Sequence, residues 1–306
     1  MMRFLPTLFG LLLLVGFDAF AADNDAQVTE VTVIEVEKVE VDNAEVEQTQ
    51  AQSNQQKKKK QQDEEQPYWE LEVGGALMLG RYAMDSFNDS ETGFYRIAPW
   101  LAGGYYDGNF FVESDPGNAK PITIGYTSYE SDDFQLNLVA MPFFSGFDES
   151  AQLRGDLITG LEERSASFDA GIEILSSFKY GQVGIRALYD ISEIHSGSVV
   201  DFVYGYPLYF DKTVVWPSIG VSYVSEEANN YYYGIRESEV RPDRPFYEVD
   251  GGFVTKFNLY FEHELSETNS IIGFSQLNLL NSSIQGSPIV EHSYSFTIGV
   301  GYIWIY

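Results

Sequence analysis

The feature that most limits the possible fold is the alternation of side chains in the last stretch of the chain, Ser293–Tyr306. Every even-numbered position is apolar or aromatic, whereas the odd-numbered positions begin with serine, threonine and glycine. A period of two predicts a β-strand, because successive side chains leave a strand on opposite faces. The long apolar face and its aromatic end favour a membrane-spanning strand with lipid on one side and a polar lumen on the other. The alternative is an ordinary strand of a soluble β-sandwich.

The N-terminus predicts export from the cytoplasm. Arg3 is followed by an apolar core from Phe9 to Phe17, and Ala19-Phe20-Ala21 offers a cleavage site. This pattern is typical of a secretory signal peptide, which we place at residues 1–21. No cysteine follows it, so a lipid anchor is not expected, and no later stretch approaches the ~18 apolar residues of a membrane helix. An exported chain without such helices can span a bilayer only as a closed barrel.

Residues 22–66 differ in composition from the rest of the chain. They hold 12 acidic residues and five lysines, a net charge of −7, and no aromatic residue. Such a segment cannot bury enough apolar surface to offset its ordering entropy. We expect a disordered periplasmic tail, either a solvated tether or a segment that orders on a partner.

Residues 67–306 contain a succession of period-two segments that predict an all-β, closed antiparallel transmembrane β-barrel of about twelve strands. The segments lie at 69–79, 95–105, 109–113, 122–127, 134–138, 168–174, 182–190, 201–208, 215–223, 253–264, 270–280 and 293–306. The eleventh, Ser270–Leu280, alternates poorly and is assigned by its position.

The connections between these segments alternate in length. Short hairpin turns are expected at 107–108, 131–133, 179–181, 211–212 and 266–269, and long connections at 82–94, 144–165, 224–252 and 281–292. Short turns on one rim and long loops on the other are typical of outer-membrane barrels, in which the long loops face outside. We therefore expect the protein in the outer membrane of a Gram-negative cell, with its tail in the periplasm, in contact with outer-membrane lipid and lipopolysaccharide.

The alternation also predicts which charged side chains face the lumen. This set comprises Glu70, Glu72, Arg96, Asp169, Glu173, Arg186, Asp190, Lys256, Glu262 and Glu264. Charges within a low-dielectric wall must be paired or remain hydrated. We expect either a paired, plug-like network or a narrow pore that prefers cations.

The chain resembles the MipA/OmpV family of outer-membrane proteins over most of residues 67–306. The resemblance is carried by the order and spacing of Leu157–Leu161, Asp190–Gly197, Tyr232–Ile235, Pro245–Tyr247, Gly251-Gly252 and Ser287–Val290, followed by the aromatic end. It implies a scaffold that joins a lytic transglycosylase to a murein synthase, or a porin-like or adhesin-like role. The final residue is Tyr306, whereas family members commonly end in phenylalanine. We expect the motif residues to shape loops rather than to perform chemistry.

The aromatic C-terminal end is also a candidate targeting signal. Phe296, Tyr302, Trp304 and Tyr306 resemble the C-terminal signal by which outer-membrane barrels are passed to the barrel insertion machinery. We expect this machinery to be a partner of the protein during assembly.

Catalytic and metal chemistry receive little support from the sequence. The chain has no cysteine and three histidines that are not clustered, so neither a metal site nor a cofactor is expected. His195-Ser196 and His292-Ser293 are adjacent pairs, and on a strand such neighbours point to opposite faces, which disfavours a nucleophile and its base. A net charge of −28 argues against nucleic-acid binding.

Three functions therefore remain open. We expect a non-enzymatic envelope scaffold for murein hydrolases or synthases, with a small narrow porin as the alternative. An outer-membrane lipid hydrolase that uses Ser196 is a further alternative.

Overall fold

The computed structural model describes residues 66–118, 120–143, 146–147 and 157–306. These residues belong to one compact unit. The predicted signal peptide (1–21) and tail (22–66) lie outside the described residues, apart from Gln66. In the described part of the chain, no helix is long and apolar enough to cross a membrane.

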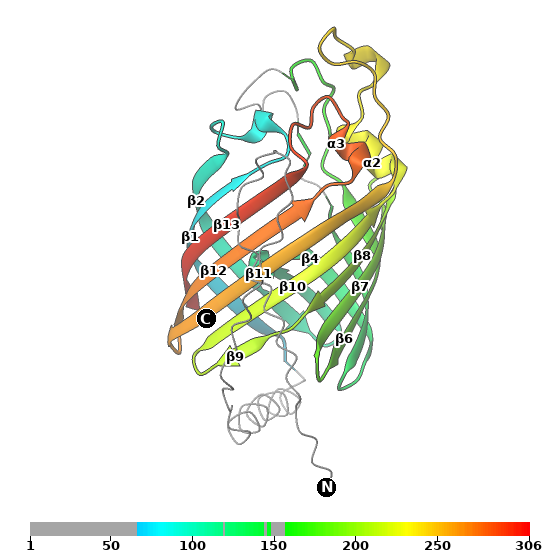
Figure 1. Ribbon diagram of the computed structural model, residues 1–306. Helices are drawn as coiled ribbons and strands as arrows, with labels where there is room; N and C mark the ends of the chain where they lie inside the picture. The colour runs from blue at the N-terminus through cyan, green and yellow to red at the C-terminus, as the bar shows by residue number, and fades with distance from the viewer. Residues whose placement is uncertain (1–65, 119, 144–145, 148–156) are drawn as a thin grey trace, which may run out of the picture. The chain divides into compact units, whose positions relative to one another are not determined.

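In the described part of the chain, thirteen antiparallel strands form a single closed sheet (Figure 1). They are β1 (Tyr68–Arg81), β2 (Phe94–Asp107), β3 (Phe110–Asp115), β4 (Lys120–Glu130), β5 (Phe134–Pro142), β6 (Phe168–Phe178), β7 (Gly181–Asp190), β8 (Ser198–Gly205), β9 (Leu208–Phe210), β10 (Thr213–Val224), β11 (Gly252–Ser266), β12 (Asn269–Leu279) and β13 (Tyr294–Ile305). The ring closes because β1 pairs with β13 and β10 pairs with β11.

The predicted barrel of twelve strands is confirmed, since β8 and β9 occupy one position in the ring. Both pair with β10, and Pro207 lies in the gap between them. Proline has no backbone N–H to donate to the ladder, so it weakens strand pairing at this point. The predicted eighth strand is therefore a single position in the barrel that is occupied by two strand segments, β8 and β9.

The outer surface follows the predicted alternation. On β2, Ile97 is 81% exposed and Leu101 is 63% exposed, whereas the intervening Trp100 is 4% exposed. On β13, Ile298, Val300 and Trp304 are exposed, and Ile303 between them is fully buried. Large apolar side chains standing outside a closed sheet are what a bilayer requires.

The two rims differ as the connection lengths predict. The hairpins that join β2 to β3, β4 to β5, β6 to β7, β9 to β10 and β11 to β12 share the rim at which the C-terminus lies (Figure 1). Gly108 and Asp211 adopt positive φ angles in two of these turns, a conformation that tight hairpins demand. The opposite, long-loop rim carries η1 (Asp85–Phe87), α2 (Glu226–Tyr233), η4 (Glu237–Glu239) and α3 (Ser282–Gln285).

The lumen departs from the predicted polar interior. A cluster that we call the apolar layer packs inside the barrel; its members are Ala76, Trp100, Ala102, Tyr260, Ile272, Phe274 and Ile303. The rings of Trp100 on β2 and Phe274 on β12 lie 5.5 Å apart between centroids. A barrel of this size is narrow enough for side chains of separate strands to meet. The inward-facing Ile272 and Phe274 also explain why this strand alternates poorly in the sequence.

The connection between β3 and β4 reinforces the apolar layer. It is a tight turn, η2 (Pro116–Asn118), at the end of a short strand. The side-chain amide of Gln276 on β12 donates to the carbonyl oxygen of Pro116 at 3.0 Å. A Cβ atom on Gly117 would lie 2.5 Å from the ring of Tyr260 on β11. This turn therefore contacts strands elsewhere in the ring.

Candidate functional site

The long-loop half of the lumen carries a row of polar side chains on neighbouring strands. We call it the polar hoop; it comprises Asn137, Glu173, Arg186, Asp201 and Ser222, which are successive register partners from β5 to β10. Register partners on one face of a sheet lie side by side, so their side chains interact. The alternation of the strands thus places a chain of donors and acceptors along the inner wall.

The acidic members of the hoop are held by hydrogen bonds. Glu173 accepts from the side-chain amide of Asn137 at 3.1 Å. Asp201 accepts from the hydroxyl of Ser222 and, at 3.2 Å, from the ammonium group of Lys256. Arg186 lies between the two carboxylates, with its Nε atom 4.0 Å from Glu173 and 3.8 Å from Asp201. The hoop and Lys256 therefore form a paired network, in which the guanidinium group has the longest contacts.

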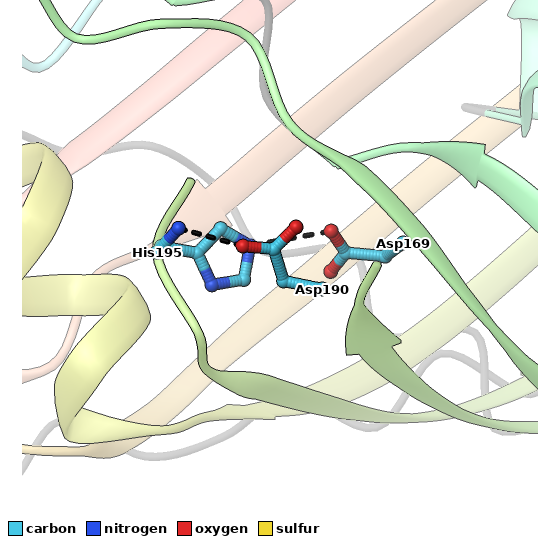
Figure 2. Close-up of side chains that lie close together, drawn as sticks. All are labelled: Asp169, Asp190 and His195. Atoms are coloured by element: carbon cyan, nitrogen blue, oxygen red, sulfur yellow. Dashed lines mark hydrogen bonds and ion pairs between the residues drawn. The ribbon is translucent and has the colours of Figure 1, made fainter. Parts of the chain in front are cut away.

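A second group of buried side chains gathers where β6 begins and β7 ends. Asp169, Asp190 and His195 offer potential ligand atoms within 4.8 Å of one another (Figure 2). One oxygen of Asp190 accepts from the backbone and hydroxyl of Ser192, and the other from the backbone N–H groups of His195 and Ser196. Four donors on one carboxylate fix the course of the 191–197 loop, in which Glu193 and Ser196 adopt positive φ angles.

The hydrogen bonds of His195 decide what this cluster can do. Its Nδ1 atom accepts from the backbone N–H of Gly197 at 3.0 Å, so in the neutral ring the proton resides on Nε2. Nε2 then donates to Asp169 at 3.2 Å. Neither ring nitrogen is left to coordinate a metal or to take a proton from Ser196. Of the three residues, only Asp169 retains an oxygen without a partner in the described structure. The arrangement favours a loop anchor over a metal or hydrolytic site.

The other two histidines are also engaged. His292 contacts Asp85 at 2.8 Å and so ties two long loops together. His263 lies 2.8 Å from the hydroxyl of its cross-strand neighbour Thr213. Within the described residues, no hydrogen bond links a histidine ring to a serine hydroxyl.

The ten side chains predicted to face the lumen do not converge on one site. Glu173 and Arg186 belong to the polar hoop and Lys256 adjoins it, whereas Asp169 and Asp190 meet His195. Glu72 accepts from Trp100 at 3.2 Å and Glu262 from Tyr260 at 3.2 Å, both beside the apolar layer. Arg96 lies near the long-loop rim, 3.9 Å from Asp89. Glu70 and Glu264 are exposed near the hairpin rim.

Sequence reasoning missed several residues that complete these groups. Asp201 lies at an inward-facing position of its strand, and the alternation of that strand in the sequence already indicated this. Asn137 and Ser222 have the same parity but are uncharged. His195 lies in a loop, so no periodicity could place its ring against Asp169.

Above the hoop, the long connections pack into a cap over the barrel. We call this the loop cap; its buried core comprises Met84, Phe147, Ile158, Leu161, Ile235, Val249, Ile284, Ile289 and Val290. Four of the motifs that carry the family resemblance contribute to it, from Leu157–Leu161, Tyr232–Ile235, Pro245–Tyr247 and Ser287–Val290. The motif residues therefore shape loops, as expected: Ser287 donates to the carbonyl of Tyr233 at 2.6 Å, and Tyr247 to that of Ser283 at 2.9 Å.

Two buried arginines cross-link the cap. Arg164 forms a two-pronged ion pair with Glu239, at 2.8 and 2.9 Å, and both side chains are inaccessible to solvent. Arg244 donates to the carbonyl oxygens of Glu239, Leu157 and Thr159. Burial alone would raise the pKa of Glu239, but hydrogen bonds from Arg164 and from two backbone N–H groups hold it below its ordinary value. These bonds join loops that are far apart in the sequence.

Between the hoop and the cap lies a chamber of about 950 Å³. Arg186, Lys256 and Asp201 line one side of it, while Phe143 and Tyr232 are among its aromatic lining. On β11, Lys256 precedes Tyr260 and lies closer to the long-loop rim, so the chamber sits on the outer side of the apolar layer.

Comparison with known proteins identifies the family. The family model described as MltA-interacting protein MipA matches residues 73–306. The outer membrane protein Omp26La of Vibrio anguillarum is 24% identical over 193 residues, covering 62% of this chain and 74% of that protein. The putative outer membrane protein YiaT of Escherichia coli K12 is 24% identical over 236 residues, covering 77% and 90%. The MltA-interacting protein of the same strain is 25% identical over 142 residues, covering 46% and 57%.

Among solved structures, OprB of Pseudomonas putida gives a TM-score of 0.42 at 7% identity, covering 83% of this chain and 97% of that one. Because the family model spans well over half of the chain, and the chain folds as a closed barrel with an apolar exterior, it belongs to the MipA family of outer-membrane proteins.

Proposed function

We propose that this protein is a non-enzymatic adaptor of the outer membrane that holds peptidoglycan-processing enzymes at its periplasmic face. One relative bears the name MltA-interacting protein, which says that it interacts with MltA. The proposal extends that kind of partnership, with a murein hydrolase or synthase, to this chain.

The observation that carries the proposal is the apolar layer. Trp100, Tyr260 and Phe274 are nearly inaccessible inside the lumen, and the η2 turn packs against Trp100 and Tyr260. Water-filled conduits are lined by polar groups, so this packing supports the porin alternative less well. Both ring nitrogens of His195 are engaged in hydrogen bonds, so this ring is not placed to act as a base for Ser196. The lipid-hydrolase alternative is therefore also less well supported. Of the three hypotheses, these features best support a binding role.

The hairpin rim is the surface that such a partner would meet. Its turns expose Asp107, Asp132, Asp133, Asp211 and Glu267, against Lys179 and Lys212. This excess of acidic groups favours a partner with a basic surface, because complementary charge accelerates and orients association.

Co-precipitation with purified murein hydrolases and synthases of the same cell tests the proposal. The full-length barrel should retain at least one of these enzymes, and the double substitution Asp132→Lys with Asp133→Lys should weaken retention. Glu237→Lys, an exposed acidic residue at the opposite rim, is the matched control and should change nothing.

Removing residues 22–66 separates the two possible docking elements. Retention lost with the tail but unchanged by the hairpin substitutions would place the contact in the tail. If neither enzyme class is retained by the unaltered protein, the adaptor proposal fails.

A further inference from the structure

The chamber between the polar hoop and the loop cap has cationic groups with unused donors. Arg186 is 18% exposed, and in the described structure its only hydrogen bond is from one terminal nitrogen to the sulfur of Met141, at 3.5 Å. Its carboxylate neighbours lie at 3.8 and 4.0 Å, beyond hydrogen-bonding distance. A guanidinium carries five N–H donors, so most of the donors of Arg186 have no protein acceptor.

Lys256 adds a second cation beside Arg186. Its ammonium group is 3.2 Å from Asp201 and is 31% exposed. Because Asp201 contacts both cations, the ammonium and guanidinium groups lie close together on the same side of the chamber. An ammonium has three donors, and only one of them has a protein partner among the contacts of the described residues.

The carboxylates of the network already accept hydrogen bonds from the protein. Asp201 also lines the chamber; its Oδ1 atom accepts from both Ser222 and Lys256, while its Oδ2 atom lies 3.8 Å from Nε of Arg186. The side chain of Glu173 is 3% exposed, and one of its oxygens accepts from Asn137. Glu173 does not line the chamber, whereas Arg186 and Lys256 do. Among the described residues, the charged side chains that line the chamber are three cations, Arg96, Arg186 and Lys256, and two carboxylates, Asp89 and Asp201. The chamber wall therefore carries an excess of positive charge.

The remaining walls of the chamber are mostly apolar. Leu188 on β7 and Val199 on β8 line the chamber on one side. Val254 on β11 and Leu280, which directly follows β12, line it on the other. Phe143 contributes an aromatic face. Apolar walls with a few convergent polar groups are the usual composition of a small-molecule site.

We propose that the chamber binds a small amphiphilic carboxylate, with the carboxylate group on Arg186 and Lys256 and the apolar body against the aliphatic and aromatic walls. Two charge-assisted hydrogen bonds to one carboxylate would satisfy donors that the protein leaves unpaired. This binding role goes beyond the adaptor function and does not depend on it, since the chamber and the hairpin rim lie at opposite sides of the apolar layer.

Binding of naphthoate to the full-length protein in lipid nanodiscs tests the proposal, with empty nanodiscs measuring partition into lipid. Calorimetry should show saturable binding of naphthoate and none of its neutral amide. Lys256→Met should weaken binding by about tenfold or more, the loss expected for one charge-assisted hydrogen bond. Arg186→Met should have a similar or larger effect.

Lys212→Met, at the exposed hairpin between β9 and β10, is the matched control and should leave binding unchanged. Folding of each variant is checked by the mobility of the unheated barrel on gels; should Arg186→Met fail to fold, Lys256→Met decides alone. Equal binding of acid and amide, an unchanged affinity in Lys256→Met, or no saturable binding would each overturn the proposal and leave the cations as parts of a structural network only.

Discussion

At the scale of single residues, the loop cap depends on charges that have no access to water. Arg164 and Glu239 are both buried, and each is hydrogen-bonded by additional groups: Arg164 to two carbonyl oxygens and Glu239 to two backbone N–H groups. A buried pair is not a strong source of stability by itself, but breaking it leaves an uncompensated charge. This pair therefore fixes the arrangement of two long loops, 144–165 and 224–252, relative to each other.

Replacing Arg164 tests that role. Arg164→Met should destabilise the loop cap by about 3–5 kcal/mol, because Glu239 would remain buried without its cation. Hydrogen exchange of the backbone amides in 157–167 and 225–251 would show the loss of protection. Arg236→Gln breaks the exposed ion pair with Glu162 in the same cap and should cause little change; equal effects of the two variants would contradict the role of burial.

The same carboxylate gives the cap a pH dependence. The pKa of Glu239 is below its ordinary value of 4.5 in the folded protein, so its stabilising contribution is complete above 4.5 and is lost as pH falls through the folded-state value. Cap protection, corrected for intrinsic exchange rates, should therefore decrease on strong acidification while the strands remain protected. In Arg164→Met the pH dependence should shrink, and an unchanged profile would contradict this assignment.

At the scale of elements, the η2 turn determines how the lumen is filled. The neighbouring strand β3 is only six residues long, so the turn that follows it falls within the barrel instead of at the rim. Gly117 allows the turn to approach Tyr260, because any side chain there would collide with the ring. Close approach of a backbone to an aromatic ring is one of the positions that glycine alone permits.

A methyl group at Gly117 should disrupt this contact. Gly117→Ala should reduce stability by about 1–3 kcal/mol through overpacking, measured as the urea midpoint for loss of the folded barrel. Gly75→Ala is the control, because a Cβ atom there meets only a carbonyl oxygen at 3.8 Å. If both variants unfold at the same urea concentration as the unaltered protein, the turn does not pack as described.

At the scale of the whole molecule, the barrel has an exterior suited to lipid and an interior divided by the apolar layer. The chamber lies on the long-loop side of this layer, and the hairpin rim lies on the other side. A path through the barrel would have to pass side chains that already contact one another. The apolar layer therefore separates the chamber on the long-loop side of the barrel from the hairpin rim on the other side.

Conductance measurements test this division. The unaltered protein should be silent in planar bilayers, whereas Trp100→Ala combined with Tyr260→Ala should open a measurable conductance, because the substitutions remove two large rings from the layer. Trp69→Ala, on the lipid-facing side of β1, should remain silent. Channel activity in the unaltered protein would revive the porin alternative.

The sequence by itself determined the order of the strands, which face of most of them meets lipid, and which rim carries the long loops; the strand from Ser270 to Leu280 was the exception, because its alternation is poor. These properties are local, since a period of two and a tight turn are encoded within a few adjacent residues. Ser293–Tyr306 shows this, because its alternation matches the exposed and buried sides of β13.

Only the tertiary structure decided which inward-facing residues meet. Trp100 and Phe274, Arg186 and Asp201, and His195 and Asp169 are brought together by the register between strands, the narrow width of the ring and the packing of loops. These quantities belong to the closed barrel as a whole, and no single segment encodes them, so the apolar layer, the polar hoop and the chamber could not be read from periodicity.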